Sequence, residues 1–439
     1  MKKIIYFSFI LLISFASSTI SRAQLPNPVL VGYFHNWSDF NAPYIQLNTI
    51  DSRYNVIDIA FAVPQSGSDY NMTFVPENVT QATFISQIQA LQNLGKKLII
   101  SIGGASAPVS LDDTIERNMF ISSMTAIINT YGFDGIDIDL EGSSVSVSGG
   151  TIATPVDAKI INLIAAIKQI MSNYRLQNNK KLLLTMAPET AYVQGGQSAY
   201  GGIWGAYLPI IHALRDSLDL LHVQLYNSGS MYGIDASIYN QGTADFIVSM
   251  TEAVIHGFNT SGGYFTGIPA NKIAVALPAC VSAGGGYIAP LTVKSAIDYL
   301  RGVGSKPGTY TLTQAGGYPD LRGMMTWSVN WDAVSTCGSV YEFANNFQTI
   351  FGGSTSIIKN SIQDDKKLVV FPNPTTGVFL INTAEVYEKS NQLFIYNAVG
   401  KIVYNRVIRN EIETINISEF PAGIYYLISG SYRKKIVKI

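Results

Sequence analysis

Charged residues and histidines are scarce in this chain of 439 residues. Only 13% of the residues are charged and the formal net charge is −1, which argues against nucleic acid or an anionic membrane surface as the main partner. The four histidines lack metal-ligand spacing, so we expect neither a catalytic metal nor another cofactor. We interpret all four as structural or surface residues: His35, His212, His222 and His256.

Long hydrophobic runs are lacking after the N-terminus, whereas a membrane span needs about 20 apolar residues. Residues 1–23 combine a basic start at Lys2 and Lys3, a short apolar run, and the small residues Ser21 and Ala23. This pattern predicts a signal peptide. We therefore expect a mature chain without a membrane span, exported through the periplasm and either secreted or held at the cell surface.

Cysteine is nearly absent, because the chain contains only Cys280 and Cys337. An exported protein can oxidise such a pair. The two residues follow the seventh and eighth strands predicted below, so neighbouring loops could bring them together. A disulfide and two free thiols both remain open.

The most informative stretch is residues 131–142, in which apolar and acidic residues alternate strictly from position 136 to 141. Period-two alternation predicts a β-strand with Asp137, Asp139 and Glu141 on one face. Carboxylates on such a face lie roughly 7 Å apart and repel one another. We therefore predict that the row keeps a proton near neutral pH, as a general acid must. A metal site and an exposed acidic edge strand are the alternatives.

Strand-like and helix-like segments alternate through the first 350 residues. The predicted strands are 29–34, 56–61, 97–102, 136–140, 182–186, 220–226, 273–277 and 323–327. The predicted helices are 82–94, 117–131, 158–174, 207–217, 244–256, 293–301 and 340–351, and the crossover at 35–55 has no clear helix. Eight such units predict an α/β fold, a (β/α)8 TIM barrel. An open doubly wound sheet would need a Gly-rich turn after the first strand, and none is present.

A barrel of this kind carries its active site at the C-terminal ends of its strands. The motifs at these ends resemble those of the family 18 glycoside hydrolases, the chitinase family, over residues 27–352. The motifs are Asp134-Gly-Ile-Asp137-Ile-Asp139-Leu-Glu141, Ser101-Ile-Gly103-Gly104, Met186-Ala-Pro-Glu189, Gln224-Leu-Tyr226-Asn227 and Met325-Thr-Trp327-Ser-Val-Asn-Trp331-Asp332.

The resemblance implies a retaining chitinase that uses substrate-assisted catalysis. The short segment after the seventh strand, described below, adds the expectation of an endo-acting enzyme. Glu141 would be the general acid, Asp139 would orient the 2-acetamido group, Asp137 would share a proton with Asp139, and Tyr226 would bind the acetamido oxygen. Asp134, off the acidic face, would brace the strand. The residues expected to line the substrate, chitin or N-acetylglucosamine oligomers, are Tyr33, Phe61, Gly104, Met186, Gln224, Asn227 and Trp327.

Two other functions fit the same barrel. An endo-β-N-acetylglucosaminidase that acts on the chitobiose core of N-glycans would use the same acid and acetamide. A non-catalytic chitin-binding lectin would be expected to lack the acid, and Glu141 is present. Only about fifteen residues, 278–292, separate the seventh strand from its helix, so the family's optional α+β insertion is missing and we expect an open groove.

The composition changes after residue 352. We place the catalytic domain at 24–352, a linker at 353–366 and a second domain at 367–439, where short strands predict a small antiparallel β-sandwich. This domain resembles the C-terminal sorting domain of the type IX secretion system, with Pro372-Asn-Pro-Thr-Thr-Gly377 near its start and a basic last strand. The resemblance implies the secretion machinery as a partner. A sugar-binding β-module is the alternative.

Overall fold

The computed structural model describes residues 24–334, 338–352, 369–382, 392–398, 401–407, 410, 412–429 and 432–439. The predicted signal peptide and linker lie outside these described residues. The chain divides into two compact units between residues 353 and 354, and each unit is described by itself.

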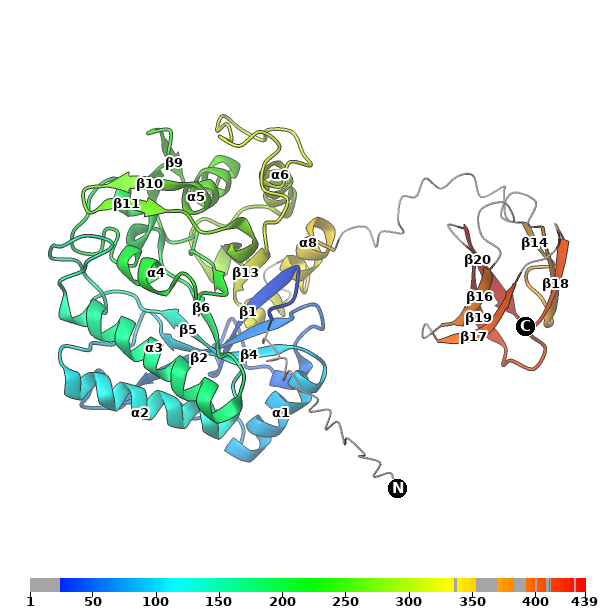
Figure 1. The fold of residues 1–439 in the computed structure, drawn as a ribbon, viewed down its shortest axis with the longest axis horizontal. Helices are drawn as coiled ribbons and strands as arrows, with labels where there is room; N and C mark the ends of the chain where they lie inside the picture. Colours follow the sequence, from blue (N-terminus) through cyan, green and yellow to red (C-terminus); the bar gives the residue numbers. More distant parts are fainter. Residues whose placement is uncertain are drawn as a thin grey trace, which may run out of the picture. The chain divides into compact units, whose positions relative to one another are not determined.

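The first unit is a barrel of eight parallel strands (Figure 1). In spatial order the strands are β12 (Ala274–Pro278), β13 (Gly323–Trp327), β1 (Val29–His35), β2 (Val56–Pro64), β4 (Lys97–Gly103), β5 (Gly135–Asp139), β6 (Leu183–Met186) and β7 (Leu220–Leu221). Parallel bridges from Leu221 to Ile273 and from Gln224 to Ala276 join β7 to β12 and close the barrel. The predicted (β/α)8 fold is confirmed.

Burial on both faces explains why these strands are hydrophobic throughout. On β1, Val29, Val31 and Tyr33 face a small cluster inside the barrel, whereas Leu30 and Phe34 belong to the large cluster between strands and helices. The other strands alternate in the same way. Polar side chains on the inward face are therefore enclosed by the barrel.

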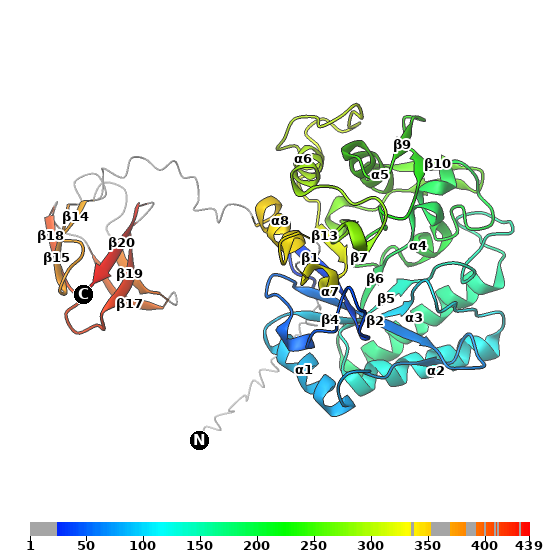
Figure 2. The ribbon, with the colours of Figure 1, turned by 180° about the vertical axis from the view of Figure 1, so that it is seen from behind.

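Helices cover the outside of the barrel, and α2 and α3 run side by side (Figures 1 and 2). The helices are α1 (Gln81–Asn93), α2 (Thr114–Tyr131), α3 (Ala158–Asn178), α4 (Leu208–Leu214), α5 (Ala244–His256), α6 (Pro290–Leu300), α7 (Val329–Asp332) and α8 (Glu342–Ile350). The first crossover, which the sequence left unassigned, contains only the 3-10 turn η1 (Leu47–Thr49).

Three features differ from the prediction. The strand predicted at 220–226 is regular only over β7. The segment that follows β6 and lies beside it contains Pro188, which has no N–H to donate to the ladder. The hairpins β8 (Ser230–Tyr232)–β9 (Ile238–Asn240) and β10 (Gly257–Thr260)–β11 (Gly263–Thr266) are additions that the sequence pattern did not reveal. A short strand β3 (Met72–Thr73) also pairs with the end of β2.

The connection between β12 and α6 is short, as expected. It spans residues 279–289 and contains one 3-10 turn, η5 (Val281–Ala283). No additional domain is therefore inserted at this point of the barrel rim.

The second unit contains two antiparallel sheets. One has the order β14 (Val369–Phe371)–β15 (Val378–Asn382)–β18 (Ile412–Asn416), and the other β17 (Ile402–Val407)–β16 (Gln392–Asn397)–β19 (Gly423–Ser429)–β20 (Tyr432–Lys438). Both sheets contribute to one hydrophobic cluster that includes Phe379, Ile415, Leu393 and Leu427. This agrees with the predicted antiparallel β-sandwich. Within the described parts of both units, no helix is both long and apolar enough to span a membrane.

Candidate active site

The predicted row of acids lies on β5 and faces the inside of the barrel. Ile136 and Ile138 pack outward in the large cluster, so Asp137 and Asp139 point inward, as the alternation predicts. Both aspartates are buried. Glu141 lies two residues beyond the end of the strand, half-buried at the barrel mouth.

Asp137 is the deepest acid of the row and accepts three hydroxyl hydrogen bonds. Oδ2 accepts from Tyr33 Oη at 2.5 Å and from Ser101 Oγ at 2.7 Å, while Oδ1 accepts from Thr185 Oγ1 at 2.6 Å. Hydrogen bonds to the charged form favour an ionised carboxylate. The three donors fix the orientation of the Asp137 carboxyl group.

Asp139 and Glu141 share one hydrogen-bond donor. The amide Nε2 of Gln224 lies 2.9 Å from Asp139 Oδ1 and 3.0 Å from Glu141 Oε1. Burial raises the pKa of Asp139 well above its usual range, and the charges of Glu141 and Asp137 and a hydrogen bond to Glu141 add to the effect. Burial therefore favours the protonated form of Asp139, whose side chain lies next to that of Glu141. The Asp137 oxygens accept from three hydroxyl groups, and the sharing of a proton between Asp137 and Asp139 stays a prediction.

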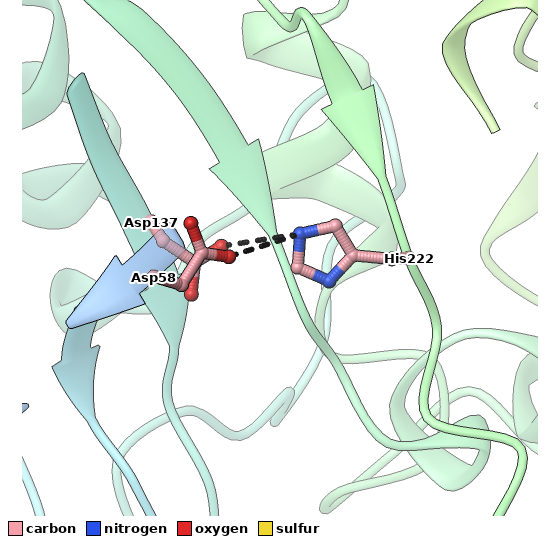
Figure 3. A group of neighbouring side chains, drawn as sticks. All are labelled: Asp58, Asp137 and His222. Atoms are coloured by element: carbon pink, nitrogen blue, oxygen red, sulfur yellow. Dashed lines mark ion pairs between the residues drawn. The ribbon is translucent and has the colours of Figure 1, made fainter. Parts of the chain in front are cut away.

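Beneath Asp137, the barrel encloses a group that the sequence did not reveal (Figure 3). His222 Nε2 lies 3.6 Å from Asp137 Oδ1 and 3.7 Å from Asp58 Oδ2, and all three side chains are fully buried. Burial raises the pKa of Asp58, with repulsion from Asp137 adding to it, and burial lowers the pKa of His222. Both side chains are therefore neutral near pH 7.

The same three side chains bring donor atoms within 4.8 Å of one another, which is close enough to consider a metal ion. Three hydroxyl hydrogen bonds to Asp137 and two neutral neighbours make a poor cation site, since a cation prefers ionised carboxylates. We therefore interpret Asp58 and His222 as a neutral polar layer under the acidic row. His222 is structural, as predicted, although it adjoins the candidate catalytic residues.

A pocket of about 430 Å³ opens above the row. Trp327 and Phe61 stack with ring centroids 5.9 Å apart and planes 13° apart, and Trp37 stacks on Phe61 at 6.1 Å. Flat aromatic faces beside carboxylates suit a sugar ring, which offers apolar C–H groups and polar hydroxyls. The lining comprises Trp37, Phe61, Val63, Gly103, Gly104, Ala105, Ser106, Ala107, Asp139, Glu141, Glu189, Gln224, Tyr226, Asn227 and Trp327.

Three lining residues have specific local roles. Gly104 has φ +78°, and a Cβ at this position would lie 2.7 Å from the Phe61 ring, so both backbone and space require glycine. Asn227, also at positive φ, accepts a hydrogen bond from Gly285 N at 2.7 Å and so anchors the short loop after β12. Burial, with Asp139 next in effect, raises the pKa of Tyr226, which therefore keeps its hydroxyl proton.

Two predicted lining residues lie elsewhere. Met186 is fully buried in the cluster between strands and helices, because it occupies an outward position of β6; the next inward polar residue is Glu189. Tyr33 lies below the pocket, between Asp137 and the Trp327 ring. Asp134 accepts hydrogen bonds from Leu98 N and Gln92 Nε2, which agrees with its expected bracing role.

Sequence reasoning missed three residues of this region. Glu189 ends the motif of the fifth strand, which predicts no role for it; burial, with the charge of Glu141 next, raises its pKa to about 7. Trp37 stands in the irregular crossover, where no periodicity marks it. Asp58 had a usable signal, since it is a lone acid in the apolar run of β2.

Of the two cysteines, for which the sequence left a disulfide and free thiols open, the structure describes one. Cys280 is buried at the start of η5 and is disulfide-bonded. Cys337, its possible partner, lies outside the described residues.

A parallel eight-stranded barrel with a carboxylate pair and an aromatic-lined pocket at its C-terminal rim defines the class of barrel glycosidases. Residues 29–308 match the glycosyl hydrolases family 18, and the chain belongs to that family. Residues 369–439 match the secretion system C-terminal sorting domain, which confirms the predicted sorting domain and an exported protein.

The chain is similar to several chitinases. It is 46% identical over 331 residues to chitinase Chi52 of Paenibacillus xylanexedens, covering 73% of this chain and 62% of that protein. It is 45% identical over 352 residues to chitinase D of Niallia circulans, covering 77% and 65%. The chain thus spans less than two thirds of the length of either relative.

A solved structure shares the fold. The family 18 chitinase of Chromobacterium violaceum matches with a TM-score of 0.66 and 34% identity, over 75% of this chain and 85% of that one.

Proposed function

We propose that this chain is a chitinase that hydrolyses the β-1,4 bonds between N-acetylglucosamine units, with Glu141 as general acid. The observation that carries the proposal is the contact of Gln224 Nε2 with both Asp139 and Glu141 at the edge of the aromatic pocket. Family membership and the names of the similar proteins support chitin as the substrate.

The first step breaks the glycosidic bond. The 2-acetamido oxygen of the sugar attacks C1 and forms an oxazolinium ion, while Glu141 gives its proton to the leaving oxygen. The proton held between Asp139 and Glu141 supplies this step, because its transfer to Glu141 leaves Asp139 as a carboxylate that accepts the acetamido N–H. The Tyr226 hydroxyl donates to the acetamido oxygen, and Trp327 supports the sugar ring.

The second step restores the enzyme. Glu141, now a carboxylate, takes a proton from water as the water oxygen attacks C1 and the oxazolinium ring opens. Two displacements at C1 retain the anomeric configuration. Three hydroxyl donors hold the Asp137 carboxyl group in place beneath Asp139, where its oxygens favour the positive charge of the intermediate.

The short β12–α6 connection supports cleavage at internal bonds of the chitin polymer, because it adds no domain that would close one side of the pocket at the barrel rim. We propose an endo mode for this reason. We also propose that the domain at 367–439 engages the type IX secretion machinery, on the strength of the sorting-domain match.

Assays of chitin oligomers with NMR detection of the product anomer test the proposal. We expect β-anomer product first, from internal bonds, and a loss of kcat of about 10³-fold in Glu141→Gln. Glu419→Gln, an exposed Glu of the second unit, is the matched control. Near-normal rates in Glu141→Gln would refute the acid assignment, and early products consisting of disaccharide alone would refute the endo mode.

A high-mannose glycoprotein assayed in parallel separates the rival function. Release of its N-glycans, with chitin oligomers left intact, would identify an endo-β-N-acetylglucosaminidase instead. Tight binding of chitin oligomers by the unmodified chain without cleavage of either substrate would identify a lectin.

A further inference from the structure

Glu141 lies outside the regular pairing of the barrel. The ladder between β5 and β6 ends at Ile138, and the ladder between β5 and β4 ends at Asp139. The peptide groups of residues 140–142 therefore lack the strand partners that fix a barrel residue. Other groups must hold this segment for the Glu141 carboxyl to stay beside Asp139.

The hydroxyl of Tyr207 replaces the missing strand partner. It accepts a hydrogen bond from Leu140 N at 2.6 Å and lies 3.0 Å from Leu140 O, to which it donates. The side chain is fully buried. One phenol thus satisfies both backbone groups of the residue before Glu141.

Tyr192 holds the residue after Glu141. Its hydroxyl donates to Gly142 O at 2.8 Å, and its ring packs edge-on against the Tyr207 ring with centroids 5.8 Å apart. Tyr207 N also donates to Tyr192 O at 3.0 Å. The two tyrosines form one unit, which we call the tyrosine pair, within the segment that follows β6.

We propose that the tyrosine pair positions the general acid by holding the peptide groups on both sides of Glu141. A buried backbone N–H that loses its partner must shift or be resolvated, so Leu140 would move without the Tyr207 hydroxyl. Displacement of a catalytic group by about 1 Å is enough to lower a rate 100-fold. This inference rests on the proposed function, since its readout is glycoside hydrolysis.

Removal of single hydroxyls tests the inference. The variants are Tyr207→Phe, Tyr192→Phe and, as a matched control, Tyr131→Phe at the end of α2, which loses a buried hydroxyl that donates to Phe74 O. We expect kcat on a chitin oligomer to fall about 10- to 100-fold in Tyr207→Phe and about 3- to 10-fold in Tyr192→Phe, with KM nearly unchanged. Tyr131→Phe should keep the unmodified kcat.

A binding measurement separates positioning from general damage. In a Glu141→Gln background, calorimetry should give the same affinity for the oligomer with or without Tyr207→Phe, because the pocket lining is untouched. Equal kcat in Tyr207→Phe, Tyr192→Phe and the control would overturn the inference. A change confined to KM or to binding affinity, with kcat unchanged, would also overturn it. If Tyr207→Phe does not fold, Tyr192→Phe alone decides. An unmodified chain without hydrolytic activity would instead refute the proposed function.

Discussion

His222 Nε2 lies 3.7 Å from Oδ2 of Asp58 in the closed interior of the barrel. Among the described residues, none forms a hydrogen bond with either ring nitrogen of His222 or with either carboxyl oxygen of Asp58. An ionised carboxylate without donors is costly in such a place, so folding favours the protonated acid. Asp58 is therefore an ionisable residue that the fold keeps neutral.

Asp58→Asn is expected to stabilise the protein at neutral pH. The pKa of Asp58 is raised on folding, so the folded state binds a proton that the unfolded state has lost above its ordinary pKa of 3.8. Stability of the unmodified chain therefore falls as pH rises above that value, and the Asn variant escapes this loss. The thermal unfolding midpoint of the Asn variant should exceed that of the unmodified chain by at least about 2 °C near pH 7, and the two midpoints should be equal near about pH 3.

Thermal unfolding at both pH values provides the measurement, with Asp320→Asn, an exposed aspartate, as the control. A midpoint difference that does not change with pH, or an Asn variant less stable near pH 7, would contradict the neutral assignment of Asp58.

Glu189 is expected to shape the alkaline side of the activity profile. Its pKa of about 7 means that it ionises across neutral pH, where its charge opposes loss of the proton held by Asp139 and Glu141. Glu189→Gln removes that charge. The alkaline limb of kcat/KM should therefore move to lower pH in the variant, and the acid limb should change less.

Initial rates across the pH range on one chitin oligomer check this expectation. An alkaline limb that stays in place in Glu189→Gln would show that the Glu189 charge does not reach the acid pair.

Gly104→Ala is expected to displace the Phe61 ring, which stacks on Trp327 in the pocket lining. The added methyl group would lie 2.7 Å from Phe61 Cε2, and alanine also resists the φ of +78°. Gly67 has a similar φ of +83° with open space around it, so Gly67→Ala measures the backbone cost alone, about 1 kcal/mol. Gly104→Ala should cost about 2 kcal/mol more and raise KM several-fold.

Urea unfolding and oligomer kinetics of the two variants provide the comparison. Equal stability losses and equal KM values would mean that Phe61 moves aside without consequence for substrate binding.

The barrel was predictable because its signals are local. Strict alternation over 136–141 specifies a strand whatever its neighbours, and the eight repeated units leave few other topologies. The same argument failed for Met186, because the motif gives its place on the strand but not which face turns inward. It also failed for the strand predicted at 220–226, because Pro188, in the adjacent segment after β6, interrupts the pairing.

Chain order alone decides that Asp137, Asp139 and Glu141 stand in one row, because side chains alternate along any strand. Which of them is ionised is decided by groups far away in the chain. Gln224 contacts the row although it lies more than 80 residues away in the chain, and Asp58, Tyr33 and His222 lie beside Asp137 from other parts of the barrel. Desolvation and Coulomb interactions depend on burial and on distances between groups in space, and both are set only when the barrel closes.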